Sequence, residues 1–458
     1  MEALIIIFIT GLIAMFIAMA KKPVLVLITA MLGLLTALSS LIYQVNFPYE
    51  WLHYDGLKFD IYANMYGIVA LSFGLLIILA GYQNFKKEPE HTGEYISLLL
   101  FSLCGVLCML SFTDLFMFFL GLEILSIPIY VMAGSRKKDL KSSEASMKYF
   151  FTGAFATGVL LFGIAWLYGA VGTFKIDEIA LAIENPATHS SLLFIGVLLI
   201  MASFLFKIGA APFHFWSPDV YGGSPNVVTA FMASVVKLAA FGAFLKLFTT
   251  AFGGIHDFWA PALVILSILT MFVGNLTAIR QTKFKRLIAY SSITHAGYAL
   301  MTIISKSYDS AFNLWVYFLA YGFSIIALIV ISKIIDDEED DLASYKGFAR
   351  KNPFAGFVLI LSLLSLAGVP PLAGFFGKYL VFSSVFTEYP TLVIIALANS
   401  GIAIYYYLRM ISSSMTKDDS TSAESNEEAV PYKIEPIYAI VLVICAIGLL
   451  AGGAVTMF

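Results

Sequence analysis

The sequence has little charge. Only 12% of its 458 residues are Asp, Glu, Lys or Arg, whereas 60% are hydrophobic, and the mean hydropathy is +0.88. A soluble globular protein carries about 25% charged residues, so this composition excludes a soluble domain as the main body of the chain. We expect an integral membrane protein. The net charge of −3 gives no information about its partners.

Cysteine is scarce as well. Cys104, Cys108 and Cys445 all fall inside apolar runs, where packing is a more common role than a disulfide or a metal ligand. The sequence contains no zinc or iron–sulfur spacing, no phosphate-binding P-loop and no GxGxxG motif after a strand. It therefore predicts a chain that binds no metal, nucleotide, redox cofactor or nucleic acid.

The sequence does contain a series of apolar runs. Each is about 20 residues long, the length that a helix needs to cross a hydrocarbon core of about 30 Å. We count about fourteen: 3–20, 24–43, 62–82, 94–111, 114–134, 146–171, 191–209, 226–249, 258–279, 285–304, 310–334, 355–382, 391–413 and 434–457. The predicted fold class is therefore an all-α polytopic membrane protein with about 14 transmembrane helices.

The basic residues between these runs predict the orientation. Most Lys and Arg lie in the odd-numbered connections, whereas the even-numbered ones hold only Lys58, Lys175 and Lys306. By the positive-inside rule, both termini then lie on the non-cytoplasmic side. The acidic stretches 336–341 and 418–428 fall on the inside, where we expect solvated loops.

Few ionisable residues lie deep in the predicted helices: Glu123, Lys207, Lys237, His295 and Lys378. Each costs about 2.5–3.5 kcal/mol on insertion scales, so a bundle keeps such a residue where it pairs, contacts water or has a function. We predict functional roles for the glutamate and the three lysines. His295 is open between a relay and a neutral imidazole satisfied by a neighbouring serine or carbonyl.

Lysine and glutamate together suit proton transfer. Burial disfavours the protonated lysine, and a nearby carboxylate favours it, so a moving carboxylate can load or unload the lysine's proton. An arginine could not release its proton, and every deep basic residue here is Lys or His. Lys246, near the end of its predicted helix, is expected only to reach the interface. Glu144, four residues before Lys148, is expected to form a surface ion pair.

Two of the deep lysines lie beside breaks in their apolar runs. The stretch "GAAP" (209–212) follows Lys207, and "GVPPLAGFFG" (368–377) precedes Lys378. Non-helical backbone at membrane depth is tolerated where it lines a wet cavity, although a packing kink is the alternative. Breaks five helices apart predict two inverted five-helix repeats, about runs 4–8 and 9–13. The predicted divisions are 1–93, a three-helix segment; 94–250 and 258–413, the two repeats; and 414–458, an acidic loop and a last helix.

Several stretches resemble one known family. They are "LGLEILSIPIYVMAG" (120–134), "SSEASMKYFFTGAFATG" (142–158), "FKIGAAPFHFWSPDVYGGSPNVVTAF" (206–231), "IRQTKFKRLIAYSSITHAGY" (279–298) and "LAGVPPLAGFFGKYLVF" (366–382). Together they resemble the antiporter-like membrane subunits of NADH-quinone oxidoreductase, respiratory complex I. The subunit N branch, the counterpart of mitochondrial subunit 2, is the most similar.

The resemblance implies a role for each deep residue. Glu123 and Lys207 would form the charge pair of a first half-channel, Lys237 would be a central relay, and Lys378 would be the terminal site of a second half-channel. It implies a proton-translocating subunit without a redox site of its own. NADH, FMN, iron–sulfur clusters and quinone would be bound by other subunits.

The resemblance also implies where the protein works. We expect a multi-pass protein of the bacterial inner membrane, in contact with lipids and with other membrane subunits, including homologous antiporter-like ones. Two alternatives stay open at this point. One is a subunit of a cation/proton antiporter or of a membrane-bound hydrogenase; the other is a structural membrane spacer whose buried charges only lock helices together.

Overall fold

The computed structural model describes residues 1–47, 54–82, 91–337, 339–416 and 432–455. Within these ranges every regular element is a helix, and the only β contacts are isolated bridges. The prediction of an all-α fold is confirmed. The acidic stretch 418–428 lies outside the described residues.

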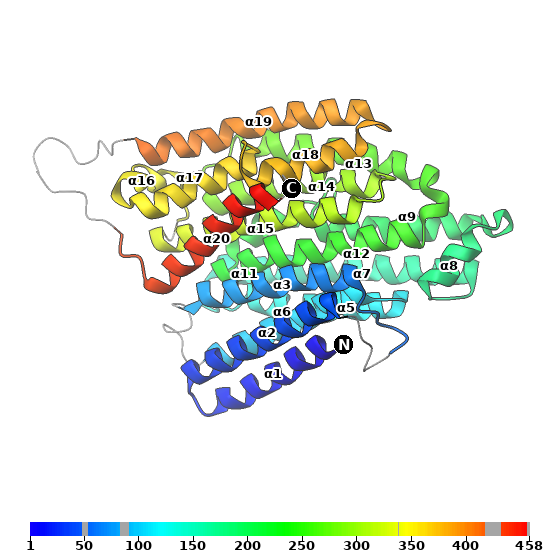
Figure 1. The fold of residues 1–458 in the computed structure, drawn as a ribbon, viewed down its shortest axis with the longest axis horizontal. Coiled ribbons are helices and arrows are strands. Elements are labelled where there is room, and N and C mark those ends of the chain that lie inside the picture. Colours follow the sequence, from blue (N-terminus) through cyan, green and yellow to red (C-terminus); the bar gives the residue numbers. More distant parts are fainter. Residues whose placement is uncertain (48–53, 83–90, 338, 417–431, 456–458) are drawn as a thin grey trace, which may run out of the picture. The chain divides into compact units, whose positions relative to one another are not determined.

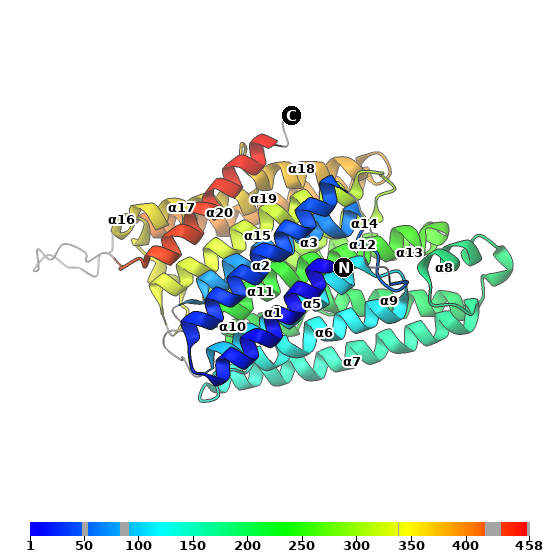
Figure 2. The ribbon, with the colours of Figure 1, turned by 60° about the horizontal axis from the view of Figure 1, so that its bottom comes forward.

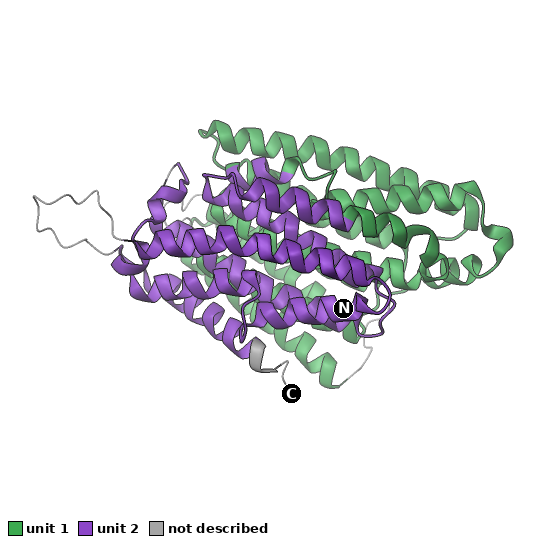
Figure 3. Cartoon of the chain, turned by 90° about the horizontal axis from the view of Figure 1, so that it is seen from above, with its two compact units in different colours: residues 1–216, 223–266 green, residues 217–222, 267–458 purple. Residues whose placement is uncertain are grey.

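The chain divides into two compact units, shown separately coloured in Figure 3. Unit 1 comprises residues 1–216 and 223–266, and unit 2 comprises residues 217–222 and 267–458. Two helices, α10 (Trp216–Gly223) and α13 (His256–Ala278), belong partly to each unit. The predicted divisions at 93, 250 and 413 and the inverted repeats stay predictions.

Unit 1 contains the N-terminal helices. In chain order they are α1 (Glu2–Met19), α2 (Pro23–Asn46), α3 (Ile61–Ala80), α5 (Thr92–Ser111), α6 (Leu115–Ala133), α7 (Leu140–Val171), α8 (Ile176–Ile183), η1 (Pro186–Thr188), α9 (Ser191–Ile208), α11 (Asn226–Phe231), η2 (Met232–Val236), α12 (Lys237–Thr250) and η3 (Gly253–Ile255). α1 and α2 run side by side as a hairpin in Figures 1 and 2. The continuous helix 226–250 is buried over most of its length and packs against α3, α5 and α9.

Unit 2 contains the C-terminal helices. They are α14 (Phe284–Ile304), α15 (Ser310–Ile335), η4 (Leu342–Tyr345), α16 (Phe348–Lys351), α17 (Pro353–Ala367), α18 (Ala373–Phe386), α19 (Pro390–Met415) and α20 (Pro436–Val455). α14 is buried almost throughout and packs against α15 and α18. This burial explains how α14 keeps its polar residues, because they face neighbouring helices and not lipid.

Twelve of the described helices are long and apolar enough to cross a membrane. Each of the fourteen predicted runs coincides with a helix or with a broken helix. The run 355–382 is divided into the shorter helices α17 and α18, and the last run, 434–457, corresponds to α20, also counted among the shorter apolar helices. The chain is thus a multi-pass membrane protein, and the count of fourteen stays a prediction.

The two predicted breaks have the same backbone geometry. α9 ends before Gly209, whose φ is 70°, and α17 ends before Gly368, whose φ is 85°. At the first break, the N–H groups of Gly209 and Ala210 donate to the carbonyls of Phe206 and Leu205. The bonds from Gly368 to Ser365 and from Val369 to Leu364 repeat this pattern. It is the Schellman motif, which needs a left-handed residue and therefore favours glycine.

Candidate functional site

Lys207 occupies the last turn of α9, directly before the first break, and is only 5% exposed. Its Nζ donates to Ser126 Oγ of α6 at 2.6 Å. A lysine near a helix C-terminus is stabilised by the carbonyl end of the helix, and the break supplies such an end inside the bundle. The hydrogen-bond acceptor of the Lys207 ammonium is thus the neutral hydroxyl of Ser126, and the end of the helix adds a favourable electrostatic contribution.

Aromatic rings complete the surroundings of Lys207. Its Nζ lies 5.9 Å from the ring centroid of Tyr130 and 5.8 Å from that of Tyr149. The Tyr149 ring stacks on Trp216, with centroids 4.7 Å apart, and the Trp216 indole N–H donates to the Phe206 carbonyl at 3.1 Å. The break thus fixes the ring stack against which the lysine rests. Ring faces attract a cation at these distances.

Glu123 lies on α6, three residues before Ser126, and so on the same side of the helix. Its Oε1 accepts a hydrogen bond from Thr157 Oγ1 of α7 at 2.8 Å. Among the described residues, no ion pair within 4.0 Å joins Glu123 to Lys207. Lys207 instead bonds to Ser126, which lies one turn from Glu123 on the same face of α6. For Glu123 and Lys207 to exchange a proton directly, one of the two side chains would have to leave its present partner and move toward the other.

Lys237 begins α12 directly after a π-helical segment, Met232–Val236, and is 3% exposed. π-helical turns are rare and often mark functional positions, because the wider turn redirects the following side chains. Lys246 is farther along the same helix. Its Nζ donates to the Leu110 carbonyl at 3.3 Å, at the C-terminal end of α5, and lies 5.0 Å from the Phe112 ring centroid. These contacts fit a structural role for Lys246.

Lys378 lies after the second break, on α18, and is 5% exposed. Its Nζ donates to the Ala367 carbonyl and to Ser400 Oγ, each at 3.0 Å, and lies 5.1 Å from the ring centroid of Tyr298. The carbonyl of Ala367 is free for this bond because α17 ends there. The break therefore supplies one of the two acceptors of the ammonium.

His295 of α14 lies between two tyrosines. Its Nδ1 is 2.6 Å from the hydroxyl oxygen of Tyr317, and its Nε2 is 3.2 Å from that of Tyr407. The Tyr407 hydroxyl is also 2.5 Å from Ser291 Oγ. An imidazole can accept a proton at one nitrogen and release one from the other, so this arrangement is suited to a relay.

A second buried polar group surrounds Asn275 of α13. Its side-chain amide donates to the carbonyl and to Oδ1 of Asn399, at 2.8 and 3.1 Å. Its Oδ1 accepts from Thr294 Oγ1 and from the Tyr406 hydroxyl, at 3.2 and 3.1 Å. Sequence reasoning did not find these residues or Ser126, because it considered only ionisable side chains. Neutral polar residues deep in apolar runs were the available signal.

The remaining predictions concern metals and the surface pair. Among the described residues, no cluster of three or more His, Cys, Asp or Glu could hold a metal ion. The three cysteines are free thiols and are buried. Glu144 and Lys148 form the expected ion pair, at 2.7 Å, on the exposed surface of α7.

Comparisons with known proteins identify the family of the chain. Residues 113–403, which include all five deep residues, match the family described as NADH:quinone oxidoreductase/Mrp antiporter, transmembrane. The chain is 39% identical to NADH-quinone oxidoreductase subunit N of Cytophaga hutchinsonii, with 90% of each chain covered. It is 40% identical to the subunit N of Trichlorobacter lovleyi, with 88% of this chain and 82% of the relative covered.

A solved structure shows the same similarity. The fold matches a chain of respiratory complex I from Thermus thermophilus with a TM-score of 0.83 and 31% identity, covering 98% of this chain and 96% of that one. The resemblance inferred from the sequence motifs is therefore confirmed.

Proposed function

The chain belongs to the NADH:quinone oxidoreductase/Mrp antiporter family, and from this premise we propose that it is a proton-translocating membrane subunit of an NADH-quinone oxidoreductase. One observation carries the proposal. Lys207 and Lys378 are both buried beside a helix break, and both donate to neutral acceptors. A buried ammonium without a permanent counterion can release its proton, which is what transport through the membrane requires.

The residues would act in sequence. Glu123 and Lys207 form the unit of the first half-channel, Lys237 is the central relay, and Lys378 is the terminal site of the second. His295 relays protons through its two nitrogens. Lysine suits these positions because its charge responds to small changes of environment, whereas an arginine stays charged.

The redox chemistry belongs to other subunits of the complex. NADH, FMN, the iron–sulfur clusters and quinone would be bound there, and this chain would respond to their reaction through its neighbouring membrane subunits. The neighbouring subunits would include homologous antiporter-like chains, and membrane lipids would surround the exposed helices. The location is the bacterial inner membrane, with both termini on the non-cytoplasmic side, in agreement with the distribution of lysine and arginine between the helices.

Two other functions make different predictions. A subunit of a cation/proton antiporter or of a membrane-bound hydrogenase would not co-purify with an NADH-oxidising flavin and iron–sulfur arm. A structural spacer would depend on its buried lysines for assembly, and each assembled complex would still pump normally. Identifying the subunits of the purified native complex tests the first alternative, and charge-removing variants test the second.

The decisive experiment uses assembled complexes in vesicles and measures protons taken up per NADH oxidised. Lys378→Ala should lower this ratio, because the terminal proton site is lost. Lys246→Gln is the matched control: it removes a lysine of unit 1 whose contacts fit a structural role, and it should leave the ratio unchanged. A normal ratio in the assembled Lys378→Ala complex would contradict the role proposed for this residue.

A further inference from the structure

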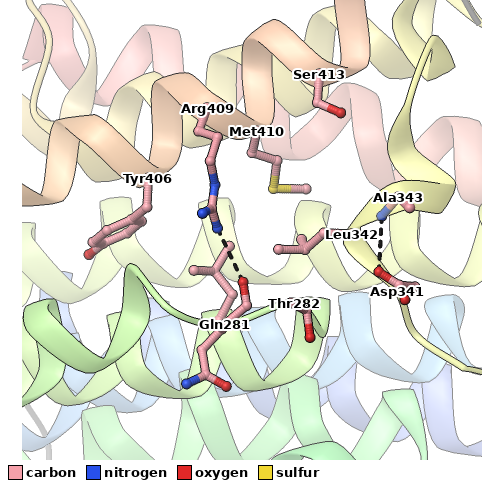
Figure 4. Close-up of a pocket in the computed structure, with 10 residues that line it drawn as sticks. Gln281, Thr282, Asp341, Leu342, Ala343, Tyr406, Arg409, Met410 and Ser413 are labelled. Carbon is pink, nitrogen blue, oxygen red and sulfur yellow. Dashed lines mark hydrogen bonds between the residues drawn. The ribbon is translucent and has the colours of Figure 1, made fainter.

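Unit 2 has a pocket at the end of its helix bundle that no function described above uses. Its volume is about 310 Å³, and the close-up in Figure 4 shows its lining. Three chain segments form it: residues 281–287, from the connection after α13 into the first turn of α14; residues 341–343, at the start of η4; and the C-terminal part of α19. The lining residues are Gln281, Thr282, Leu287, Asp341, Leu342, Ala343, Tyr406, Arg409, Met410 and Ser413.

The walls of this pocket are held by specific contacts. The Leu342 N–H donates to the Thr282 carbonyl, and the Phe284 N–H donates to the Asp340 carbonyl, both at 2.8 Å. Arg409 donates to the carbonyls of Ile279 and Gln281, at 3.0 and 3.1 Å. Two loops far apart in the sequence are thus tied to each other and to α19. These hydrogen bonds hold the walls of the pocket in place.

Tyr406 links the pocket to the interior. It lines the pocket but is fully buried, and its hydroxyl donates to Asn275 Oδ1 at 3.1 Å. In Figure 4 its ring descends from α19 beside Arg409, with the hydroxyl at the far end. Gly274 lets the helices approach closely here, because a Cβ at this position would collide with Thr294 Oγ1. One side chain therefore separates the pocket from the buried polar groups.

A series of protonatable groups continues inward from Tyr406. The ring of the next residue, Tyr407, packs against it with centroids 4.5 Å apart, and the Tyr407 hydroxyl contacts His295 at 3.2 Å. The series of hydroxyl and imidazole contacts ends at His295, and the Tyr298 ring packs beyond it, 5.7 Å from the His295 ring and 5.1 Å from Lys378 Nζ.

Lys378 contacts α19, the helix that also lines the pocket. Ser400, the hydroxyl partner of Lys378, precedes Arg409 by nine residues, about 13 Å of an α-helix.

We propose that this pocket is a mouth through which protons pass between the surrounding water and the interior of unit 2, with Tyr406 at its inner end. The inference rests on the proposed function, since it assumes that Lys378 exchanges protons. A phenol can accept a proton from water and release its own proton to a neighbouring acceptor. Here the released proton would pass by way of the Tyr407 hydroxyl to His295, so the Tyr406 hydroxyl transfers a proton without changing its charge.

Cysteine labelling tests the mouth directly. The three native cysteines are buried, so the background reaction is low. Ser413→Cys places a thiol in the pocket lining, and Ser412→Cys places one on the exposed surface beside it. A positively charged, membrane-impermeant methanethiosulfonate is applied to assembled complexes in vesicles of each orientation, with labelling measured by mass spectrometry and pumping as protons per NADH.

We expect labelled Ser413→Cys complexes to lose pumping to the level of Lys378→Ala, while labelled Ser412→Cys complexes keep it. An unreactive Cys at 413, full labelling without loss, or an equal loss at both positions would overturn the proposal. Tyr406→Phe should also lower the proton ratio, whereas Tyr405→Phe, on the exposed face of α19, should not. If Lys378→Ala itself pumped normally, the proposed function would fail independently of the mouth.

Discussion

The two buried lysines beside the helix breaks solve the same problem in different ways. Both follow or precede a Schellman turn centred on a glycine, and both contact a serine hydroxyl and a tyrosine ring. Lys207 lies before its break and takes its hydrogen-bond acceptor from another helix. Lys378 lies after its break and turns back to the carbonyl of Ala367, which the break itself leaves free.

This difference determines which substitutions should disturb each lysine site. In unit 1 the acceptor is a side chain, and a carboxylate, Glu123, lies one turn away on the same helix. In unit 2 the backbone contributes an acceptor that no substitution can delete. We therefore expect side-chain changes to affect the Lys207 site more, and changes of the break itself to affect the Lys378 site more.

We expect the largest effect from substitutions that prevent proton release at either lysine. Lys207→Arg and Lys378→Arg keep the positive charge, but a guanidinium does not give up its proton. Both variants should lose nearly all pumping per NADH in assembled vesicles, despite the differing surroundings of the two lysines. Full pumping by either Arg variant would show that the position needs only a charge and would assign it a structural role.

The next effect separates the two sites. Ser126→Ala removes the only hydrogen-bond acceptor that the described residues provide for Lys207, and a bond to a charged group contributes about 1.5–3 kcal/mol. Ser400→Ala leaves Lys378 bonded to the Ala367 carbonyl. Pumping by assembled complexes should therefore fall more in Ser126→Ala than in Ser400→Ala. Equal losses would show that the backbone carbonyl does not compensate.

The breaks and the lysines could be predicted from the sequence, but their acceptors could not. Gly and Pro beside a deep lysine give a strong local signal, since few residues accept a left-handed backbone or lack an N–H. A serine in a membrane helix gives almost none, because it is commonly satisfied by its own helix. Ser126 itself donates to the Leu122 carbonyl while accepting from Lys207.

The predicted charge pair shows the same limit. The family resemblance implied that Glu123 and Lys207 form one charge pair, and the structure places them in α6 and α9 of unit 1. Which partner each one selects depends on distances of a few ångströms between helices, and the sequence contains no such information. Thr157 and Ser126, the partners observed, are ordinary residues of apolar runs. The tyrosines around His295 come from α15 and α19, far apart in the chain.

A smaller effect concerns the second break. Gly368 has a φ of 85°, where a residue with a side chain is disfavoured by about 1–2 kcal/mol, and an added Cβ would lie 3.0 Å from Lys378 Cδ. Gly368→Ala should lower both the melting temperature of the purified complex and its pumping. Gly401→Ala is the control, since a Cβ there meets nothing within 4 Å. A Gly368→Ala complex with normal melting and pumping would contradict a role for this turn in placing the lysine.

The smallest effect tests the aromatic faces. A ring near a buried ammonium favours the charged form by up to about 2 kcal/mol, and Tyr298 lies closer to Lys378 than Tyr149 lies to Lys207. Tyr149→Leu and Tyr298→Leu should therefore move the alkaline limb of the pumping profile to lower pH, because the protonated lysine loses a stabilising contact. The shift should be at most about 1.5 pH units.

The closer ring predicts the greater displacement, so Tyr298→Leu should shift the profile more than Tyr149→Leu. Tyr149→Phe keeps the ring and removes only the hydroxyl, so it separates the two contributions in unit 1 and should leave the pH profile in place. A shift in Tyr149→Phe equal to that in Tyr149→Leu would assign the effect to the hydroxyl. The two lysines would then differ in their hydrogen bonds and not in their aromatic surroundings.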